Sequence, residues 1–248
     1  MSRWLAASIH LLISAVIAAT ALIITFYLWY PHPLFEASGA SFLLYVLVGV
    51  DVALGPLITL IIFKVGKPGL KFDLTFIAVA QVIALSYGMA VIADARPVFV
   101  VFAVDRFNAV PAHRVMEASL GRVKNEDYAE LSWTGPVLVA AELPTEREQR
   151  HELMFAALSG SDIETWPEYF VPYETQRDQV LARGWPLQRL WDRHPEQADE
   201  LRQYLDEKGY SDGRELKYLP LVAARRDMAM VVDAETAEVL TALPVNPW

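Results

Sequence analysis

The chain has 248 residues, of which 54% are hydrophobic, and its 21 basic and 30 acidic residues give a net charge of −9. It contains no cysteine, which excludes disulfides, thiolate metal sites and cysteine nucleophiles. Residues 1–94 carry four basic and four acidic side chains, so the whole net charge lies in residues 95–248. An acidic part without a basic stripe argues against binding to nucleic acid.

The first apolar run, from Trp4 to Phe35, contains no Lys, Arg, Asp or Glu. At about 1.5 Å per residue it exceeds the roughly 30 Å hydrocarbon thickness of a bilayer, so we predict a first membrane span over about residues 4–30. A secretory signal peptide is the alternative, since Arg3 gives a basic start and Ala19-Thr20-Ala21 imitates a cleavage site. The run continues well past that site, which favours a retained anchor.

Two further spans are predicted over about residues 41–63 and 72–93. The loop between the first two spans has no Lys or Arg, whereas residues 64–71 contain Lys64, Lys67 and Lys71. The positive-inside rule therefore puts the N-terminus and this loop in the cytoplasm and residues 95–248 on the other side. The chain thus divides into a three-helix transmembrane domain, residues 1–94, and an exported domain, residues 95–248.

The exported domain shows patterns of both strands and helices. Strands are predicted at 98–104 and 135–144, and near 217–224, 228–233 and 237–243, with a hairpin between the last two. Thr145 and Glu148 form a T-x-x-E capping box that is expected to open a helix reaching about Leu158. Residues 175–208 suit two or three short amphipathic helices interrupted by Gly184 and Pro195. We therefore expect an α+β fold.

No motif in the sequence indicates an enzyme or a cofactor site. There is no G-x-S-x-G elbow, no glycine-rich phosphate loop and no H-E-x-x-H metal motif. The five histidines are scattered, with His10 inside the first span, and we expect solvated side chains rather than metal ligands. We predict a non-enzymatic protein without metal or cofactor.

Two polar side chains lie deep in the predicted spans. Asp51 is about 15 Å into the second span and Gln81 about 13–14 Å into the third, so both are near the midplane. A carboxyl group there costs about 2.5–3.5 kcal/mol even on insertion scales, and something should compensate it or use it. Gly55 and Pro56 follow Asp51; the proline removes the amide donor for the Val52 carbonyl and the glycine permits close approach of another backbone.

Three interpretations of these residues stay open. Asp51 and Gln81 can pair and tie two spans together. Alternatively, Asp51, Gly55, Pro56 and Gln81 can shape a groove that binds a transmembrane helix of a partner. A proton or ion path is the third, although one carboxylate without a relay gives it thin support.

Several segments resemble the TfpX/TfpZ family of type IV pilin accessory proteins. They are VDVALGPLITLIIFK (50–64), Lys71-Phe72-Asp73-Leu74, AQVIALSYG (80–88), RPVFVVFAVDRF (96–107) and the final strand pair with its Pro-Trp end. The resemblance covers the three spans and the first strand closely and the C-terminal hairpin loosely, while residues of about 110–215 contribute little.

The resemblance implies a chaperone-like accessory factor of the bacterial inner membrane that assists the stability or assembly of one type IV pilin. Its expected partners are the transmembrane helix and the head of the major pilin, and other pilus assembly proteins in addition. It supplies no catalytic or ligand-binding residues. The alternative from another class is a membrane sensor with a ligand-binding periplasmic domain, and an intramembrane enzyme lacks any paired nucleophile and base.

Overall fold

The computed structural model describes residues 2–210 and 215–248, without the side chains of residues 42 and 43. Contacts divide the chain into two compact units. The first comprises Met1–Pro31 and Ala40–Arg96, and the second comprises His32–Gly39 and Pro97–Trp248. The short segment after the first long helix therefore groups with the C-terminal domain rather than with the helices that flank it in sequence.

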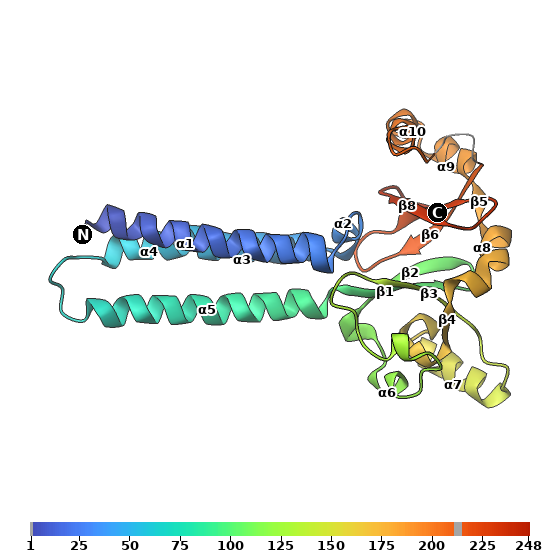
Figure 1. Ribbon diagram of the computed structural model, residues 1–248, viewed down its shortest axis with the longest axis horizontal. Coiled ribbons are helices and arrows are strands. Elements are labelled where there is room, and N and C mark those ends of the chain that lie inside the picture. Colours follow the sequence, from blue (N-terminus) through green and yellow to red (C-terminus); the bar gives the residue numbers. More distant parts are fainter. Residues whose placement is uncertain (1, 211–214) are drawn as a thin grey trace. The chain divides into compact units, whose positions relative to one another are not determined.

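The first unit is made of long apolar helices (Figure 1). Its elements are α1 (Arg3–Ile23), η1 (Ile24–Trp29), α3 (Ala40–Gly49), η2 (Val50–Leu54), α4 (Gly55–Ile62) and α5 (Leu70–Asp94). Three continuous stretches, Arg3–Trp29, Leu44–Ile62 and Leu70–Asp94, are long and apolar enough to cross a membrane. The prediction of three long apolar helices followed by a domain of mixed structure is confirmed, with helix ends close to those expected.

Two of these helices contain a turn of π-helix, η1 and η2. In η2 the amide of Gly55 donates to the carbonyl of Val50, five residues earlier. Pro56 follows directly and has no amide hydrogen, so the regular ladder cannot continue through it and the backbone widens just before the proline. The irregularity expected at Gly55-Pro56 is therefore this π-turn, and Asp51 lies inside it.

One buried hydrogen bond ties the C-terminal end of η1 to the end of α5, and a second lies at the end of α5 itself. The hydroxyl of Tyr30 donates to the carbonyl of Ile92 at 2.8 Å. Arg96, also buried, donates from Nη1 to the carbonyl of Ala93 at 2.6 Å. Because a buried polar group without a partner is costly, these bonds let two large polar side chains pack at the end of the helix bundle.

The second unit is built on one mixed sheet of eight strands in the described part of the chain. Its strands are β1 (Pro97–Ala103), β2 (Arg106–Pro111), β3 (Val137–Ala141), β4 (Phe170–Pro172), β5 (Trp185–Pro186), β6 (Leu216–Val222), β7 (Met228–Asp233) and β8 (Val239–Leu243). Their order is β4-β3-β1-β2-β6-β7-β8, and β5 pairs with β6. The pairs β1–β3 and β2–β6 are parallel and the others antiparallel.

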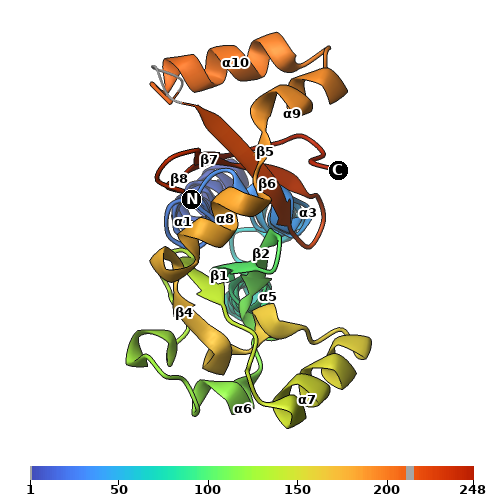
Figure 2. The ribbon, with the colours of Figure 1, turned by 90° about the vertical axis from the view of Figure 1, so that its right-hand side faces the viewer.

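The second unit also contains short helices, of which all but α2 lie between strands in sequence. The α-helices are α2 (Leu34–Ser38), α6 (Glu117–Leu120), α7 (Arg147–Leu158), α8 (Arg177–Arg183), α9 (Leu187–Arg193) and α10 (Ala198–Glu207). The 3₁₀ turns are η3 (Ala112–Arg114), η4 (Glu126–Tyr128), η5 (Ile163–Thr165), η6 (Pro167–Tyr169) and η7 (Tyr173–Gln176). The five predicted strands correspond to β1, β3, β6, β7 and β8, and the two or three short helices predicted between residues 175 and 208 are α8, α9 and α10. Within this unit α7 and α10 lie at opposite ends (Figure 2).

The predicted capping box of α7 is wrong. The helix begins at Arg147, its N-cap residue is Glu146, and no side chain caps it. The T-x-x-E pattern is therefore shifted by one residue from the N-cap that it would need, and the chain before it is held instead by Arg150, whose Nε donates to the carbonyl of Pro144 at 2.5 Å.

The core of the domain lies on both faces of the sheet. Strand β1 is buried along its whole length, with Val100 and Phe102 packing into one cluster and Phe99 and Val101 into another on the opposite face. Strand β7 alternates in the same way between the first cluster and a third. Continuous burial of both faces explains why these segments read as unbroken apolar runs.

The short helix α2 completes the first of these clusters. Leu34 and Ala37 are buried in it, and the carbonyl of Ala37 accepts from the amides of Arg225 and Arg226 at 3.0 and 3.3 Å. Gly39 takes a φ of +76°, and a Cβ there would lie 2.9 Å from Cδ of Arg225. The loop after the first long helix is thus structural, because it covers core side chains of the sheet.

Candidate functional site

Asp51 lies in the π-turn of the second long helix and is 6% exposed. Its nearest polar neighbour is Gln81 of α5, whose Nε2 donates to the Asp51 backbone carbonyl at 3.4 Å and to its Oδ1 at 3.5 Å. Both contacts are long for hydrogen bonds and correspondingly weak. Asp51 and Gln81, which were predicted to lie at similar depth in the membrane, are therefore in contact.

Gln81 is held from its other side by α1. Its Oε1 can only accept, so Nε2 of His10, 2.9 Å away, is the donor. In the neutral ring Nδ1 of His10 is then an acceptor, and the Thr59 hydroxyl, 2.6 Å away, donates to it. The cluster formed by His10, Asp51, Thr59 and Gln81 thus links all three long helices.

The environment of His10 differs from the one expected from the sequence. A solvated side chain was expected, but the ring hydrogen-bonds with Thr59 and Gln81 inside the helix unit. Counted along the helices from the predicted cytoplasmic side, His10, Thr59 and Gln81 lie within roughly 8 Å of one another in depth. The estimate of depth that placed Asp51 near Gln81 could therefore also have indicated that His10 and Thr59 lie near Gln81.

Gly55 and Pro56 are both buried at the start of α4. A Cβ at position 55 would lie 2.1 Å from Nε2 of Gln81 and 2.9 Å from its Cδ. The space left by the missing side chain of Gly55 is therefore occupied by the Gln81 amide of the same chain. Pro56 acts differently, because it forces the π-turn that contains Asp51.

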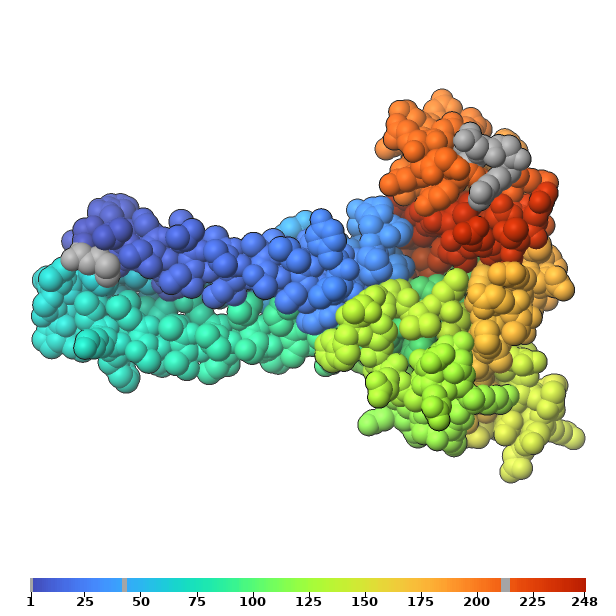
Figure 3. Space-filling model, viewed as in Figure 1, coloured from blue at the N-terminus to red at the C-terminus, as the bar shows by residue number. Residues whose placement is uncertain are grey.

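Two grooves in the helix unit meet at Asp51 and Leu85. One, of about 280 Å³, runs between the second long helix and α5 and is lined by Val46, Leu47, Val50, Asp51, Ala84, Leu85, Tyr87, Gly88 and Val91. The other, of about 190 Å³, runs between α1 and α5 and is lined by His10, Ile13, Ser14, Ile17, Asp51, Ala78, Gln81, Val82 and Leu85. Figure 3 shows the furrow between α1, in blue, and α5, in teal. Along α5 the two grooves span roughly 20 Å.

The site offers a hydrogen-bond acceptor, the Asp51 carboxyl group, among apolar side chains. Within the described residues, the long contact with Gln81 is the one side-chain hydrogen bond to the Asp51 carboxyl group. A carboxyl group in hydrocarbon costs about 2.5–3.5 kcal/mol, and a weak bond offsets only a part of that. The remaining acceptor positions are open to a donor that enters either groove. No group of three or more His, Asp or Glu in the described ranges is placed to hold a metal ion.

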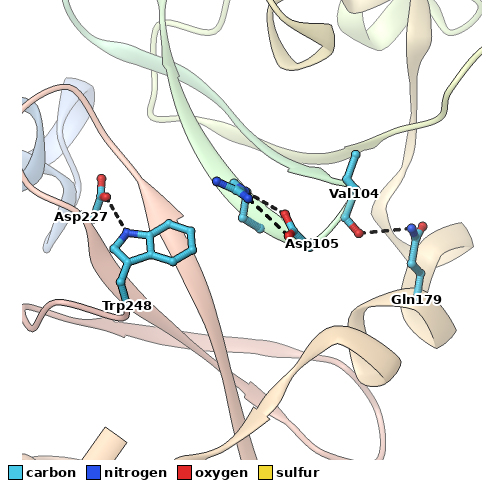
Figure 4. Close-up of polar contacts among 6 residues, drawn as sticks. Val104, Asp105, Gln179, Asp227 and Trp248 are labelled. Atoms are coloured by element: carbon cyan, nitrogen blue, oxygen red, sulfur yellow. Dashed lines mark hydrogen bonds and ion pairs between the residues drawn. The ribbon is translucent and has the colours of Figure 1, made fainter. Parts of the chain in front are cut away.

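A second polar feature lies on the C-terminal domain, at the tip of the β1–β2 hairpin (Figure 4). Val104 takes a φ of +61°, and the amide of Asp105 donates to the carbonyl of Ala103 at 2.7 Å, which makes a tight γ-turn. Gln179 donates to the carbonyl of Val104 at 3.2 Å. A β-branched residue in this conformation is strained, so the turn is held by its surroundings.

Arg106 and the last residue pack beside this turn. Nε of Arg106 donates to Oδ1 of Asp105 at 2.7 Å, and its guanidinium lies 5.0 Å from the ring centroid of Trp248. Nε1 of Trp248 donates to Oδ2 of Asp227 at 2.8 Å (Figure 4). The cation–π contact and the two hydrogen bonds hold the C-terminal residue against the hairpin.

A depression of about 410 Å³ opens beside the hairpin tip. It is lined by Ala103, Val104, Asp105, Arg106, Asn108, Asp162, Ile163, Glu164 and Val222. Burial raises the pKa of the Glu164 carboxyl group, and the nearby charge of Asp162 adds to the rise. The depression contains three carboxyl groups and the Arg106 guanidinium, which is already paired with Asp105. This mixture of charges does not indicate one class of ligand.

Comparison with known proteins gives consistent matches. The family model of the fimbrial assembly protein FimB matches residues 1–39. The fimbrial assembly protein of serogroup I from Dichelobacter nodosus is 30% identical over 244 residues, which is 97% of this chain and 94% of the relative. The serogroup E1 protein of the same organism is 29% identical over the same shares.

A third relative matches over a shorter stretch. The fimbrial assembly protein of serogroups C1 and C2 from Dichelobacter nodosus is 40% identical over 100 residues, covering 39% of this chain and 76% of that protein. No solved structure matches the chain. The similarity to the first two relatives extends through both units.

Proposed function

The chain belongs to the family of fimbrial assembly proteins, and from this premise we propose that it is a non-enzymatic accessory factor that holds a specific type IV pilin for assembly. Its place is the bacterial inner membrane, with the N-terminus in the cytoplasm and the C-terminal domain in the periplasm. The positive-inside pattern of Lys64, Lys67 and Lys71 supports this orientation. The resemblance of the spans to TfpX/TfpZ proteins supports the finer assignment to pilin accessory proteins.

The observation that carries the proposal is the placement of Asp51 between two apolar grooves. Lipid-facing surface needs no carboxyl group, and internal packing would satisfy it with closer bonds than the 3.5 Å contact to Gln81. A transmembrane helix that carries a hydrogen-bond donor would pack along the groove and complete the bonding of Asp51. A pilin before assembly is anchored by such a helix, so the groove suits it.

The four residues predicted from the sequence have distinct roles in this function. Asp51 accepts from the partner helix, Gln81 positions the Asp51 side chain, Gly55 leaves space for Gln81, and Pro56 creates the π-turn. The sensor alternative is the weaker one, because the loop between α4 and α5, residues 63–69, is too short to carry an output domain.

Crosslinking in native membranes tests this function. A photoreactive residue at Val82, which lines the groove between α1 and α5, should crosslink to the N-terminal helix of the pilin. The matched control is Ile83, which is as exposed, at 64% against 61%, but lines neither groove. Equal pilin crosslinking from both positions, or none from Val82, would refute the groove as the binding site.

A further inference from the structure

Helix α7 of the C-terminal domain exposes a stripe of large apolar side chains. Met154, Phe155 and Leu158 are 67%, 72% and 85% exposed. With His151 they occupy positions i, i+3, i+4 and i+7 of one helix and line a shallow groove of about 250 Å³. On its inner side α7 buries Leu153. We call Met154, Phe155 and Leu158 the α7 stripe.

The α7 stripe is unusual for a surface helix. An amphipathic helix normally turns its apolar stripe toward the core and its polar face toward water, whereas α7 shows these three apolar side chains to solvent. At these exposures three side chains of this size present on the order of 400 Å² of apolar surface, an area typical of interaction patches. The helix also lies at one end of the domain, where a partner can reach it (Figure 2).

The charges around the stripe indicate the chemistry of its partner. Residues 95–248 carry 17 basic and 26 acidic side chains, yet α7 itself carries two of each sign, Arg147, Arg150, Glu148 and Glu152. The stripe is thus a locally neutral area on an acidic domain. A basic partner would bind more favourably to the acidic parts of the domain, whereas an apolar, uncharged partner surface matches the α7 stripe.

The area of the α7 stripe distinguishes between a second copy of the chain and a tethered partner as the molecule that covers it. A second copy packed stripe to stripe would bury roughly 400 Å² on each side, about half of the roughly 800 Å² per partner in stable complexes. The contact is therefore too small for a stable dimer on its own. It is sufficient for a partner already tethered nearby, because tethering supplies an effective concentration on the order of millimolar.

We propose that the α7 stripe covers an apolar patch on the head of the pilin whose transmembrane helix occupies the groove at Asp51. The inference rests on the proposed function. The membrane helix of the pilin provides the tether, and the weak apolar contact shields the head until assembly. A small contact of this kind also releases readily, as a factor that passes its client to a fibre requires.

Crosslinking from the full-length protein in membranes that contain the pilin tests the proposal. A photoreactive phenylalanine analogue replaces Phe155 in one variant and Glu152, which is exposed off the stripe, in a matched control. The chain has no cysteine, so single cysteines at Leu158 and Glu152 give an independent repeat. We expect crosslinks to the pilin head from positions 155 and 158, and on the order of fivefold fewer from position 152, because contacts weaken away from the centre of an interface.

A functional readout uses the double variant Phe155→Gln with Leu158→Gln. It should lower the amount of pilin recovered with the protein by on the order of tenfold, as loss of central interface side chains does. The control Glu148→Gln with Glu152→Gln should leave recovery unchanged. Both sets change exposed positions only, and equal thermal unfolding of the full chain shows that folding is intact.

The groove crosslink from Val82 is measured in the same membranes. If Val82 reaches the pilin helix while position 155 reaches only lipid, a second copy or another protein, the α7 proposal is wrong and the proposed function stands. If neither position reaches the pilin, both are wrong. Pilin recovery unaffected by the Gln double variant would likewise overturn the role of the stripe.

Discussion

The absence of a side chain at Gly55 leaves the space that the Gln81 amide occupies, since a Cβ at position 55 would lie 2.1 Å from Gln81 Nε2. Gln81 in turn contacts Asp51 and His10. The geometry of the carboxyl group between the grooves therefore depends on a glycine of the second long helix and a glutamine of the third. This dependence makes the site open to test by small substitutions.

Gly55→Ala should displace Gln81 and destabilise the helix unit by about 1–3 kcal/mol, the usual cost of overpacking. Thermal unfolding of the purified protein in detergent measures the change. The matched control is Gly49→Ala in the same long helix, where a Cβ would meet nothing within 4 Å. Equal behaviour of the two variants would contradict the close packing of Gln81 against Gly55.

His10 and Gln81 should be coupled energetically. His10→Leu and Gln81→Leu each remove one partner of the 2.9 Å bond, and the coupling energy between the two changes should be about 0.6 kcal/mol, with about 1.7 as an upper bound for such bonds. The double variant should cost less than the sum, because the second change removes a bond that is already lost. A double-mutant cycle by thermal unfolding in detergent measures this, and strict additivity would show that the two residues act independently.

Leu34→Ala should destabilise the C-terminal domain although residue 34 precedes the second long helix in sequence. Leu34 is buried in the cluster beneath the sheet, and truncation of a buried leucine costs about 2–5 kcal/mol. The neighbouring Glu36→Ala, at an exposed position, should change stability by less than about 0.5 kcal/mol. Limited proteolysis of residues 97–248 in the full-length protein reports the difference, and equal protease resistance of both variants would argue against the packing of α2 onto the sheet.

Glu164→Gln should stabilise the domain at neutral pH. Because burial raises the pKa of Glu164 in the folded state, the folded protein binds more protons than the unfolded chain, and stability falls as pH rises through the raised pKa. The gain from the substitution should therefore be present at pH 7 and vanish below the pKa of the unfolded chain, about 4.3. Denaturant unfolding at several pH values checks this, and a gain that does not depend on pH would show that ionisation of Glu164 is not the cause.

The sequence predicted the long helices and most elements of the C-terminal domain because both follow from local pattern. Uninterrupted apolar runs set the helices, and period-two or continuous apolar runs set strands such as β1 and β7. Asp51 and Gln81 were found because a polar residue stands out in an apolar run and helical rise fixes its depth.

The features that were missed depend on contacts between distant segments. His10 and Thr59 lie at depths close to that of Gln81, but depth alone does not show which side chains of different helices face one another, and threonine is common in apolar helices. The packing of α2 into the sheet joins Ala37 to Arg225, which lies 188 residues further along the chain. The start of α7 was misplaced because a four-residue capping pattern competes with backbone contacts that the sequence does not show.

If Asp51 accepts a hydrogen bond from a pilin helix, the amount of pilin that co-purifies from membranes should depend on Asp51, and an Asp51→Ala variant measures this. We expect on the order of tenfold less pilin, with the variant still inserted in the membrane, because the donor on the pilin helix loses its acceptor. Asp73→Ala, which removes a carboxylate paired with Lys67 at the start of α5, is the control and should keep its pilin. Undiminished pilin recovery with Asp51→Ala would show that Asp51 does not bind the pilin helix and is an internal packing residue.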